Sequence, residues 1–358
     1  MVHEQALIWE KLSQLDQSLF QAECEKLTNS LNTDQLANLF IDAAYMTHAM
    51  QFIKGQYWLE NKNSEDIVVF DHFIKKHCNY ELQPILLLQS FLESSNLHSL
   101  QQIGINAETL KKRIVSLIKK KTDSEQKVFA QISLKLMSEL FNFENNLNFD
   151  KKSRNQDLGL SMYRTFDIFD ELLDLRYITD EKTTDDTKKE RLYEGAGLGV
   201  QSSYATTLNT IRYLNPKSGT RFVDLGSGYG RVGLVLGLLR SDVQFTGYEF
   251  VEDRVQIAND SVAHFNLDQH VHFYTQDLSA PDFKIPEAEF YYIFDSFTDE
   301  TYTYVMNQLV QLAENMKIKV ITKGNARLWL QNSCWNKIHE FNDGNMCIFE
   351  SLNAFVSR

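Results

Sequence analysis

The feature that most constrains the fold of this chain is a glycine-rich stretch at residues 221–239. Strand-like residues 221–224 lead into Gly226, Gly228 and Gly230, and an apolar helix is expected to follow. Glycine lets a backbone turn sharply and approach a ligand more closely than a Cβ would permit. The start of the helix offers unpaired N–H groups and a partial positive charge. The stretch therefore predicts a strand–loop–helix unit that binds a nucleotide-type cofactor.

The spacing of the glycines discriminates between nucleotides. A dinucleotide fingerprint has the form G-x-G-x-x-G, whereas these glycines occupy alternate positions and Asp224 stands at the strand end. A carboxylate there would repel a pyrophosphate and would suit a cationic ligand end, such as an amino group beside a sulfonium. A nucleotide-sugar or NAD-dependent protein remains the competing enzyme class, and the spacing and Asp224 both oppose it.

Acidic residues follow the loop at the ends of later predicted strands. These strands are expected at residues 245–250, 270–279 and 289–297. Glu249 can accept hydrogen bonds from ribose hydroxyls, and Asp277 with Leu278 is placed to contact an adenine. Asp295 ends the last of them. In an open α/β sheet, ligands bind outside the carboxyl ends of the strands, so these residues are expected to meet in one crevice.

This half of the chain resembles the class I S-adenosylmethionine-dependent methyltransferases. VDLGSGYGR, GYEF, TQDL and FDSF, at residues 223–231, 247–250, 275–278 and 294–297, are similar to the family's first, second, adenine-contacting and fourth motifs. Residues 317–324 read as a fifth strand, and 335–341 and 345–352 as a hairpin around Asn342, Asp343 and Gly344. The resemblance implies a Rossmann-like α/β sheet of seven strands that ends in an antiparallel hairpin.

The resemblance also implies a cofactor and its site. S-adenosyl-L-methionine is the expected cofactor, and its expected contacts are Tyr193, Glu194, Asp224, Gly226, Ser227, Gly228, Gly230, Glu249, Phe250, Asp277, Leu278 and Asp295. Asp295 is the candidate that orients the acceptor or takes its proton, with Phe297 and Tyr193 enclosing the methyl group. As an alternative, Asp295 bonds a neighbouring turn. No metal is expected, since the cysteines are scattered without a close histidine partner.

A narrower resemblance concerns the acceptor. Tyr193-Glu194-Gly195 is similar to the Tyr-Gly-Glu loop of the non-SET histone-lysine methyltransferases, and Asp295-Ser296-Phe297 stands where that family has Asn-Asn-Phe. The resemblance implies a protein nitrogen, with lysine as the specific acceptor. FDSF has no proline, which argues against the methylation of nucleic-acid bases. A small-molecule acceptor and a non-catalytic, cofactor-binding scaffold are the alternatives.

The first half of the chain is predicted to be an all-α helical bundle. Residues 1–150 contain one proline, and their apolar residues recur at helical spacing, which indicates about six helices. A further helix is expected at 156–176. Helix starts are predicted where Asn32 precedes Gln35, where Asp123 precedes Gln126, and at Ser64. The predicted organisation is a helical domain at 1–176, a charged linker or lid at 177–192 and the methyltransferase-like domain at 193–358.

The net charge and the hydropathy of the chain limit the partners and the cellular location that we expect. The formal net charge of −12 argues against general affinity for nucleic acid. No apolar stretch approaches bilayer length, and the first residues lack a signal-peptide character, so we expect a cytoplasmic protein. Residues 110–121 carry six Lys and Arg residues beside an apolar stripe. They form either a docking patch for an acidic partner or a solvated helix face, and we favour the solvated face. The oligomeric state is not predicted.

Overall fold

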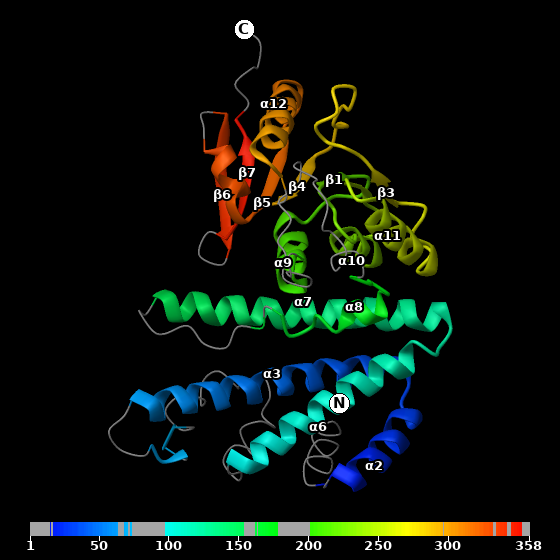
Figure 1. The fold of residues 1–358 in the computed structure, drawn as a ribbon, viewed down its shortest axis with the longest axis vertical. Helices are drawn as coiled ribbons and strands as arrows, with labels where there is room; N and C mark the ends of the chain where they lie inside the picture. The colour runs from blue at the N-terminus through cyan, green and yellow to red at the C-terminus, as the bar shows by residue number, and fades with distance from the viewer. Residues whose placement is uncertain are drawn as a thin grey trace. The chain divides into compact units, whose positions relative to one another are not determined.

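The computed structural model describes residues 15, 17–63, 68–70, 72–73, 97–153, 162, 164–177, 201–295, 297–331, 334–341 and 345–352. The chain divides into two compact units, Met1–Leu172 and Leu173–Arg358 (Figure 1). Apart from Tyr177, the predicted linker or lid at 177–192 lies outside the described residues.

The first unit is helical in its described part, which confirms the all-α prediction. Its helices are α2 (Gln17–Ser30), α3 (Thr33–Asn63), α6 (Leu97–Ile118), α7 (Asp123–Ser153) and α8 (Phe169–Leu172). Helix α3 packs against both α6 and α7, and for this reason its middle is buried almost all round. The Phe40 ring lies within 5.8–6.2 Å of the rings of Phe129, Phe166 and Phe169, which form the aromatic centre of this core.

Of the three predicted helix starts, one is confirmed, one is wrong and one lies outside the described residues. At α3, the Asn32 side chain accepts from the Gln35 N–H at 2.9 Å, and Gln35 accepts from the Asn32 N–H at 3.0 Å, so this capping box is confirmed. At α7, the predicted pair is wrong by one residue. Thr122 and Glu125 form the box instead, through the Thr122 hydroxyl and the Glu125 carboxylate. The predicted start at Ser64 lies outside the described residues.

The helix predicted at 156–176 is wrong over its described part. Residues 164–168 form turns with hydrogen bonds to the third residue back, and only the single α-turn α8 follows. Asp174 has a φ of +53°, a left-handed conformation that ends a helix.

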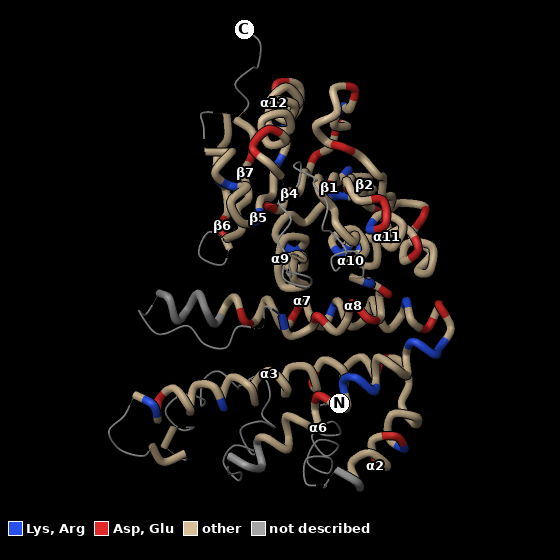
Figure 2. The backbone as a smooth tube through the Cα atoms, in the orientation of Figure 1, with Lys and Arg blue, Asp and Glu red and all other residues tan. Residues whose placement is uncertain are grey.

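The basic stretch at 110–121 is largely committed to contacts within the unit. Lys111 is buried and pairs with Glu108, and Arg113 pairs with Glu25. The stripe residues Leu110, Ile114 and Ile118 are fully buried. Lys112 also pairs with Glu108, and Figure 2 shows further basic residues at the turn between α6 and α7. These contacts agree with a solvated helix face, and docking at this stretch stays a hypothesis.

The second unit contains a seven-stranded sheet with the order β3-β2-β1-β4-β5-β7-β6. Its strands are β1 (Arg221–Leu225), β2 (Gln244–Glu249), β3 (Val271–Thr275), β4 (Phe290–Phe294), β5 (Lys319–Lys323), β6 (Trp335–Phe341) and β7 (Met346–Ser351). The first five are parallel, and β7 runs antiparallel to both β5 and β6. The predicted Rossmann-like sheet with a terminal hairpin is confirmed.

Helices cover both faces of the sheet (Figure 1). Helices α9 (Tyr204–Leu214), α10 (Arg231–Leu239) and α11 (Glu252–His264) pack together on one side. Helix α12 (Asp299–Asn315) and the 3₁₀ helix η3 (Gly324–Leu330) pack on the other. Because side chains alternate along a strand, Phe222 of β1 stacks on Phe245, whose ring lies against α10 at Gly233, while Val223 belongs to the core that packs under α12. None of the helices in the described part of the chain is long and apolar enough to cross a membrane.

Candidate functional site

The loop after β1 depends on glycine. Gly226, Gly228 and Gly230 have φ values of +88°, +55° and +83°, in the left-handed region that residues with a Cβ rarely adopt. A Cβ on Gly230 would lie 2.7 Å from the Phe273 ring and 2.8 Å from the Ala258 side chain. The predicted sharp turn is therefore present, and its third glycine is also required by packing.

The first turn of α10 leaves its N–H groups facing the loop. Gly230 is the N-cap residue, and within the described part of the chain no side-chain hydrogen bond caps the helix. An uncapped helix start favours an anionic or polar ligand atom. The loop itself is tied to β2, because the N–H groups of Gly226 and Ser227 both donate to the Tyr248 carbonyl at 2.8 Å.

Asp224 is a buried carboxylate with an unsatisfied oxygen. It is 2% exposed, and its Oδ1 has no hydrogen-bond partner among the residues that the structure describes. Burial, reinforced by the nearby Glu249 carboxylate, raises the pKa of Asp224 well above its ordinary value. A buried, unpaired carboxylate is costly, so a cationic donor that reached this oxygen would gain a strong interaction.

Glu249 holds the loop together. Its Oε2 accepts from the Gly228 N–H at 2.8 Å, and its Oε1 accepts from the Val251 N–H at 3.1 Å and from Arg254 Nη1 at 3.2 Å. A carboxylate offers about four lone-pair positions, so these donors leave room for about one further bond. The sequence analysis did not predict that Glu249 holds the loop in place. Its predicted contact to both ribose hydroxyls stays a prediction.

Five predicted residues line one pocket at the carboxyl edge of the sheet. They are Gly226, Phe250, Asp277, Leu278 and Phe297, together with Tyr248, Gln276 and Thr301. Strands β3 and β4 end earlier than predicted, at Thr275 and Phe294, so the pocket residues after them stand on loops beyond the edge. The Asp277 carboxylate accepts from the N–H and hydroxyl of Ser279 at 2.9 and 2.6 Å, which orients it.

Asp295 lies one residue beyond β4 and is 6% exposed. Its Oδ1 accepts from the Tyr302 hydroxyl of α12 at 3.4 Å. Behind it, a Cβ on Gly324 would lie 3.0 Å from the Asp295 Cβ. Asp295 is thus held between the end of β4 and the start of η3.

An aromatic wall stands beside Asp295. The Phe297 and Tyr302 rings lie 5.1 Å apart, and Tyr302 stacks on Trp329 at 5.1 Å and 12°. Tyr302 and Trp329 were missed from the sequence, because neither belongs to a motif and both reach Phe297 only through the packing of α12 and η3.

A comparison with protein-family models decides the family of this unit. A model described as a methyltransferase domain matches residues 216–347, the part of the chain that holds the loop, the pocket and the sheet up to the start of β7. Residues 216–347 are a class I S-adenosylmethionine-dependent methyltransferase domain. Among the curated proteins, no sequence matches this chain.

The solved structures to which this chain is similar include the following methyltransferases. TrmN from Thermus thermophilus is 16% identical, with 41% of this chain and 48% of that chain covered and a TM-score of 0.35. An RNA methyltransferase from Salinibacter ruber is 14% identical, with 40% and 88% covered and a TM-score of 0.32. Magnesium protoporphyrin IX methyltransferase from Synechocystis is 17% identical, with 41% and 77% covered and a TM-score of 0.32. The match thus spans about half of TrmN.

The methyltransferase domain fits its cofactor, S-adenosylmethionine. The unsatisfied Asp224 Oδ1 suits a cationic amino group, and the glycine loop leaves the backbone open to a close approach. The apolar side chains of Phe250 and Leu278 line the same pocket. When bound, S-adenosylmethionine supplies a methyl group on a sulfonium.

Arg231 is a part of the methyltransferase domain that the sequence did not bring out. It follows the last glycine of the loop and is 2% exposed. Its Nη1 donates to the Ser202 carbonyl at 2.9 Å, its Nη2 donates to the Tyr177 hydroxyl at 3.1 Å, and its guanidinium lies 4.9 Å from the centre of the Tyr204 ring. Arg231 therefore ties the chain before α9 to the cofactor loop.

Some of the residues in the two motifs compared with the lysine methyltransferases lie outside the described residues. They are Tyr193, Glu194, Gly195 and Ser296, and the roles given to Tyr193 and Glu194 stay predictions. Within the part of the chain that the structure describes, no group of three or more His, Cys, Asp or Glu side chains is arranged to hold a metal ion.

Proposed function

We propose that this protein transfers the methyl group of S-adenosylmethionine to a side-chain nitrogen of a protein, with lysine as the acceptor. The observation that supports this acceptor is Asp295, a buried carboxylate that accepts from the Tyr302 hydroxyl. The Tyr302 ring packs on Phe297, which lines the pocket. A carboxylate next to aromatic rings favours a cationic amine.

The reaction is an in-line displacement. The acceptor ammonium first gives up one proton, which frees the lone pair of its nitrogen. A bond then forms between this nitrogen and the methyl carbon while the bond between that carbon and sulfur breaks, and sulfur keeps the electron pair. Asp295 is placed to orient the amine and to accept this proton. Phe297 and Tyr302 exclude water from the site. The enzyme mainly has to align nucleophile, methyl and sulfur.

The first experiment identifies the acceptor pool. Full-length protein is incubated with methyl-labelled S-adenosylmethionine and separated protein, RNA and metabolite fractions. We expect label in the protein fraction and, after acid hydrolysis, in methylated lysine. Label in the metabolite fraction would support the small-molecule alternative. Tight cofactor binding with no label in any fraction would support the non-catalytic scaffold.

The second experiment tests Asp295. We expect Asp295→Asn to lower kcat by about 10²–10⁴-fold, the usual contribution of a general base, with the affinity for S-adenosylmethionine nearly unchanged. Asp282→Asn is the matched control, because Asp282 is exposed. Equal kcat values for the two variants would remove Asp295 from the proposed mechanism.

A further inference from the structure

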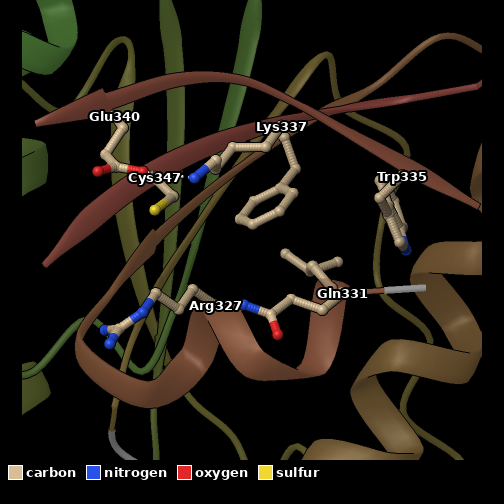
Figure 3. Close-up of a pocket in the computed structure, with 8 residues that line it drawn as sticks. Arg327, Gln331, Trp335, Lys337, Glu340 and Cys347 are labelled. Carbon is tan, nitrogen blue, oxygen red and sulfur yellow. Dashed lines mark hydrogen bonds and ion pairs between the residues drawn. The ribbon is translucent and has the colours of Figure 1, made fainter. Parts of the chain in front are cut away.

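A second pocket, of about 300 Å³, lies between η3 and the β6–β7 hairpin (Figure 3). Its two ends differ in chemistry. Arg327, Glu340 and Cys347 gather at one end, while Trp335 and Gln331 stand at the other. Pockets of this size commonly bind small molecules or single side chains.

A β-bulge creates the polar end. The pairing of β6 with β7 runs from Lys337 opposite Phe349 to His339 opposite Ile348, so that Ile338 is the extra residue. In a regular strand, residues 337 and 340 would point to opposite faces. The bulge turns both toward the pocket, where the Lys337 amine and the Glu340 carboxylate form an ion pair.

The polar end carries excess positive charge. Two cations, Arg327 and Lys337, face one carboxylate, Glu340, among the described residues that line the pocket. The hydrogen bond to Glu340 raises the pKa of Lys337, and the nearby Arg327 opposes that rise. The Arg327 Nη1 donates to the Gly324 carbonyl at 2.7 Å, and a guanidinium has five N–H donors in all. The pocket is therefore suited to an anionic group, which Arg327 can bind through paired hydrogen bonds.

The polar end lies on the same face and near the same edge of the sheet as Asp295. Ile293, Thr322, Cys347 and Glu340 form one row across β4, β5, β7 and β6. Ile293 and Cys347 belong to the core that packs under α12, and Asp295 follows Ile293 by two residues on that face. With strands about 4.8 Å apart, β7 and β6 lie about 10–14 Å to the side of β4.

We propose that this pocket binds an aspartate or glutamate side chain of the acceptor protein while the acceptor lysine reaches Asp295. The inference rests on the proposed function. An extended peptide advances about 3.3 Å per residue, so the acidic residue stands three or four positions from the lysine. Selection then depends on Arg327 and Lys337, which are specificity-determining residues away from the reacting atoms.

The test uses synthetic peptides with one lysine in a glycine–serine frame. A glutamate is placed one to six positions to either side of the lysine, and the matched peptides carry glutamine. Full-length protein and labelled S-adenosylmethionine give kcat/KM for each peptide. We expect the best glutamate peptides, at three or four positions, to exceed their glutamine partners by about tenfold, the effect of one charge-assisted hydrogen bond.

Three variants assign the preference to the pocket. Arg327→Gln combined with Lys337→Gln should bring the glutamate peptides down to the rate of the glutamine peptides, with the glutamine rate and the cofactor affinity unchanged. Glu340→Gln should enlarge the preference, because it removes the competing carboxylate. Lys317→Gln is the control, because Lys317 is an exposed lysine that pairs with Glu350, and it should alter nothing.

The outcomes separate this inference from the proposed function. Equal methylation of glutamate and glutamine peptides by the wild type, or a preference that survives in the double variant, would overturn the acidic subsite while lysine methylation stands. If no peptide is methylated, the peptide occupant is overturned. Saturation-transfer NMR with benzoate then reports on the pocket alone, since binding lost in the double variant would reveal a site for a free organic anion.

Discussion

The charged carboxylate of Asp224 is predicted to strengthen the binding of S-adenosylmethionine and to destabilise the protein when no cofactor is bound. Asp224 is 2% exposed, has an unpaired Oδ1 and lies near Glu249. Asp224→Asn keeps the shape of the side chain and removes the charge. Hydrogen bonds to charged groups are worth about 1.5–3 kcal/mol. The variant should therefore bind S-adenosylmethionine about 10- to 150-fold more weakly, at 1.4 kcal/mol for each tenfold change.

The same substitution should change the pH dependence of stability in the opposite sense. The pKa of Asp224 is raised in the folded protein, so the protonated form is the one that folding favours. The stability that this group contributes is complete below its unfolded pKa and is lost as pH rises through its folded pKa. Without cofactor, the melting temperature of Asp224→Asn relative to wild type should therefore increase as pH rises.

Two assays check this pair of effects. Isothermal titration calorimetry gives the cofactor affinity, and thermal melts between pH 4 and pH 9, roughly the range over which a raised carboxyl pKa titrates, give the stability. Asp268→Asn is the control, because Asp268 is an exposed carboxylate of the same unit. Unchanged cofactor affinity in Asp224→Asn, or a relative melting temperature that falls as pH rises, would refute the reasoning.

Three further predictions concern stability. Gly230→Ala should destabilise the protein by about 2–4 kcal/mol in urea unfolding, and the control Gly219→Ala by about 1 kcal/mol. Both glycines have positive φ, but only a Cβ on Gly230 would collide with its neighbours. Equal losses of stability in the two variants would contradict the role of packing. Arg231→Met should lower the free energy of unfolding by about 2–4 kcal/mol in the same measurement, since it breaks the hydrogen bonds to Ser202 and Tyr177. A loss below about 0.5 kcal/mol, the usual range for surface sites, would contradict a structural role for these bonds. Burial raises the pKa of Asp42 to about 7, so the stability that this group contributes below its unfolded pKa should be lost as pH rises toward 7. Asp42→Asn should remove this fall in stability from the pH profile of unfolding. An unchanged pH profile would show that Asp42 is solvated.

Much of the fold could be predicted because its signals are local. The glycines after β1 predict a sharp loop, because glycine adopts the left-handed backbone conformations of this loop more readily than other residues. The hairpin strands lie at the predicted residues, to within one residue at the ends of β7, since alternating apolar residues on either side of a turn indicate paired strands. The Asn32–Gln35 capping box needs only residues three apart. At α7 the same kind of signal gave the wrong pair, because the sequence analysis chose Asp123 and Gln126 where the structure has Thr122 and Glu125.

The sequence alone indicated the class of fold, through a family resemblance that implies a seven-stranded sheet with a terminal hairpin, and it singled out residues near the carboxyl ends of the strands. The tertiary structure decided what those residues can do. The unsatisfied oxygen of Asp224, the three donors on Glu249 and the wall of Tyr302 and Trp329 arise from contacts between segments distant in the chain. Burial and charge environment are properties of the packed neighbours, and packing brings these neighbours together from many positions at once. For this reason a motif can locate a cofactor site, while the chemistry at its edge requires the fold.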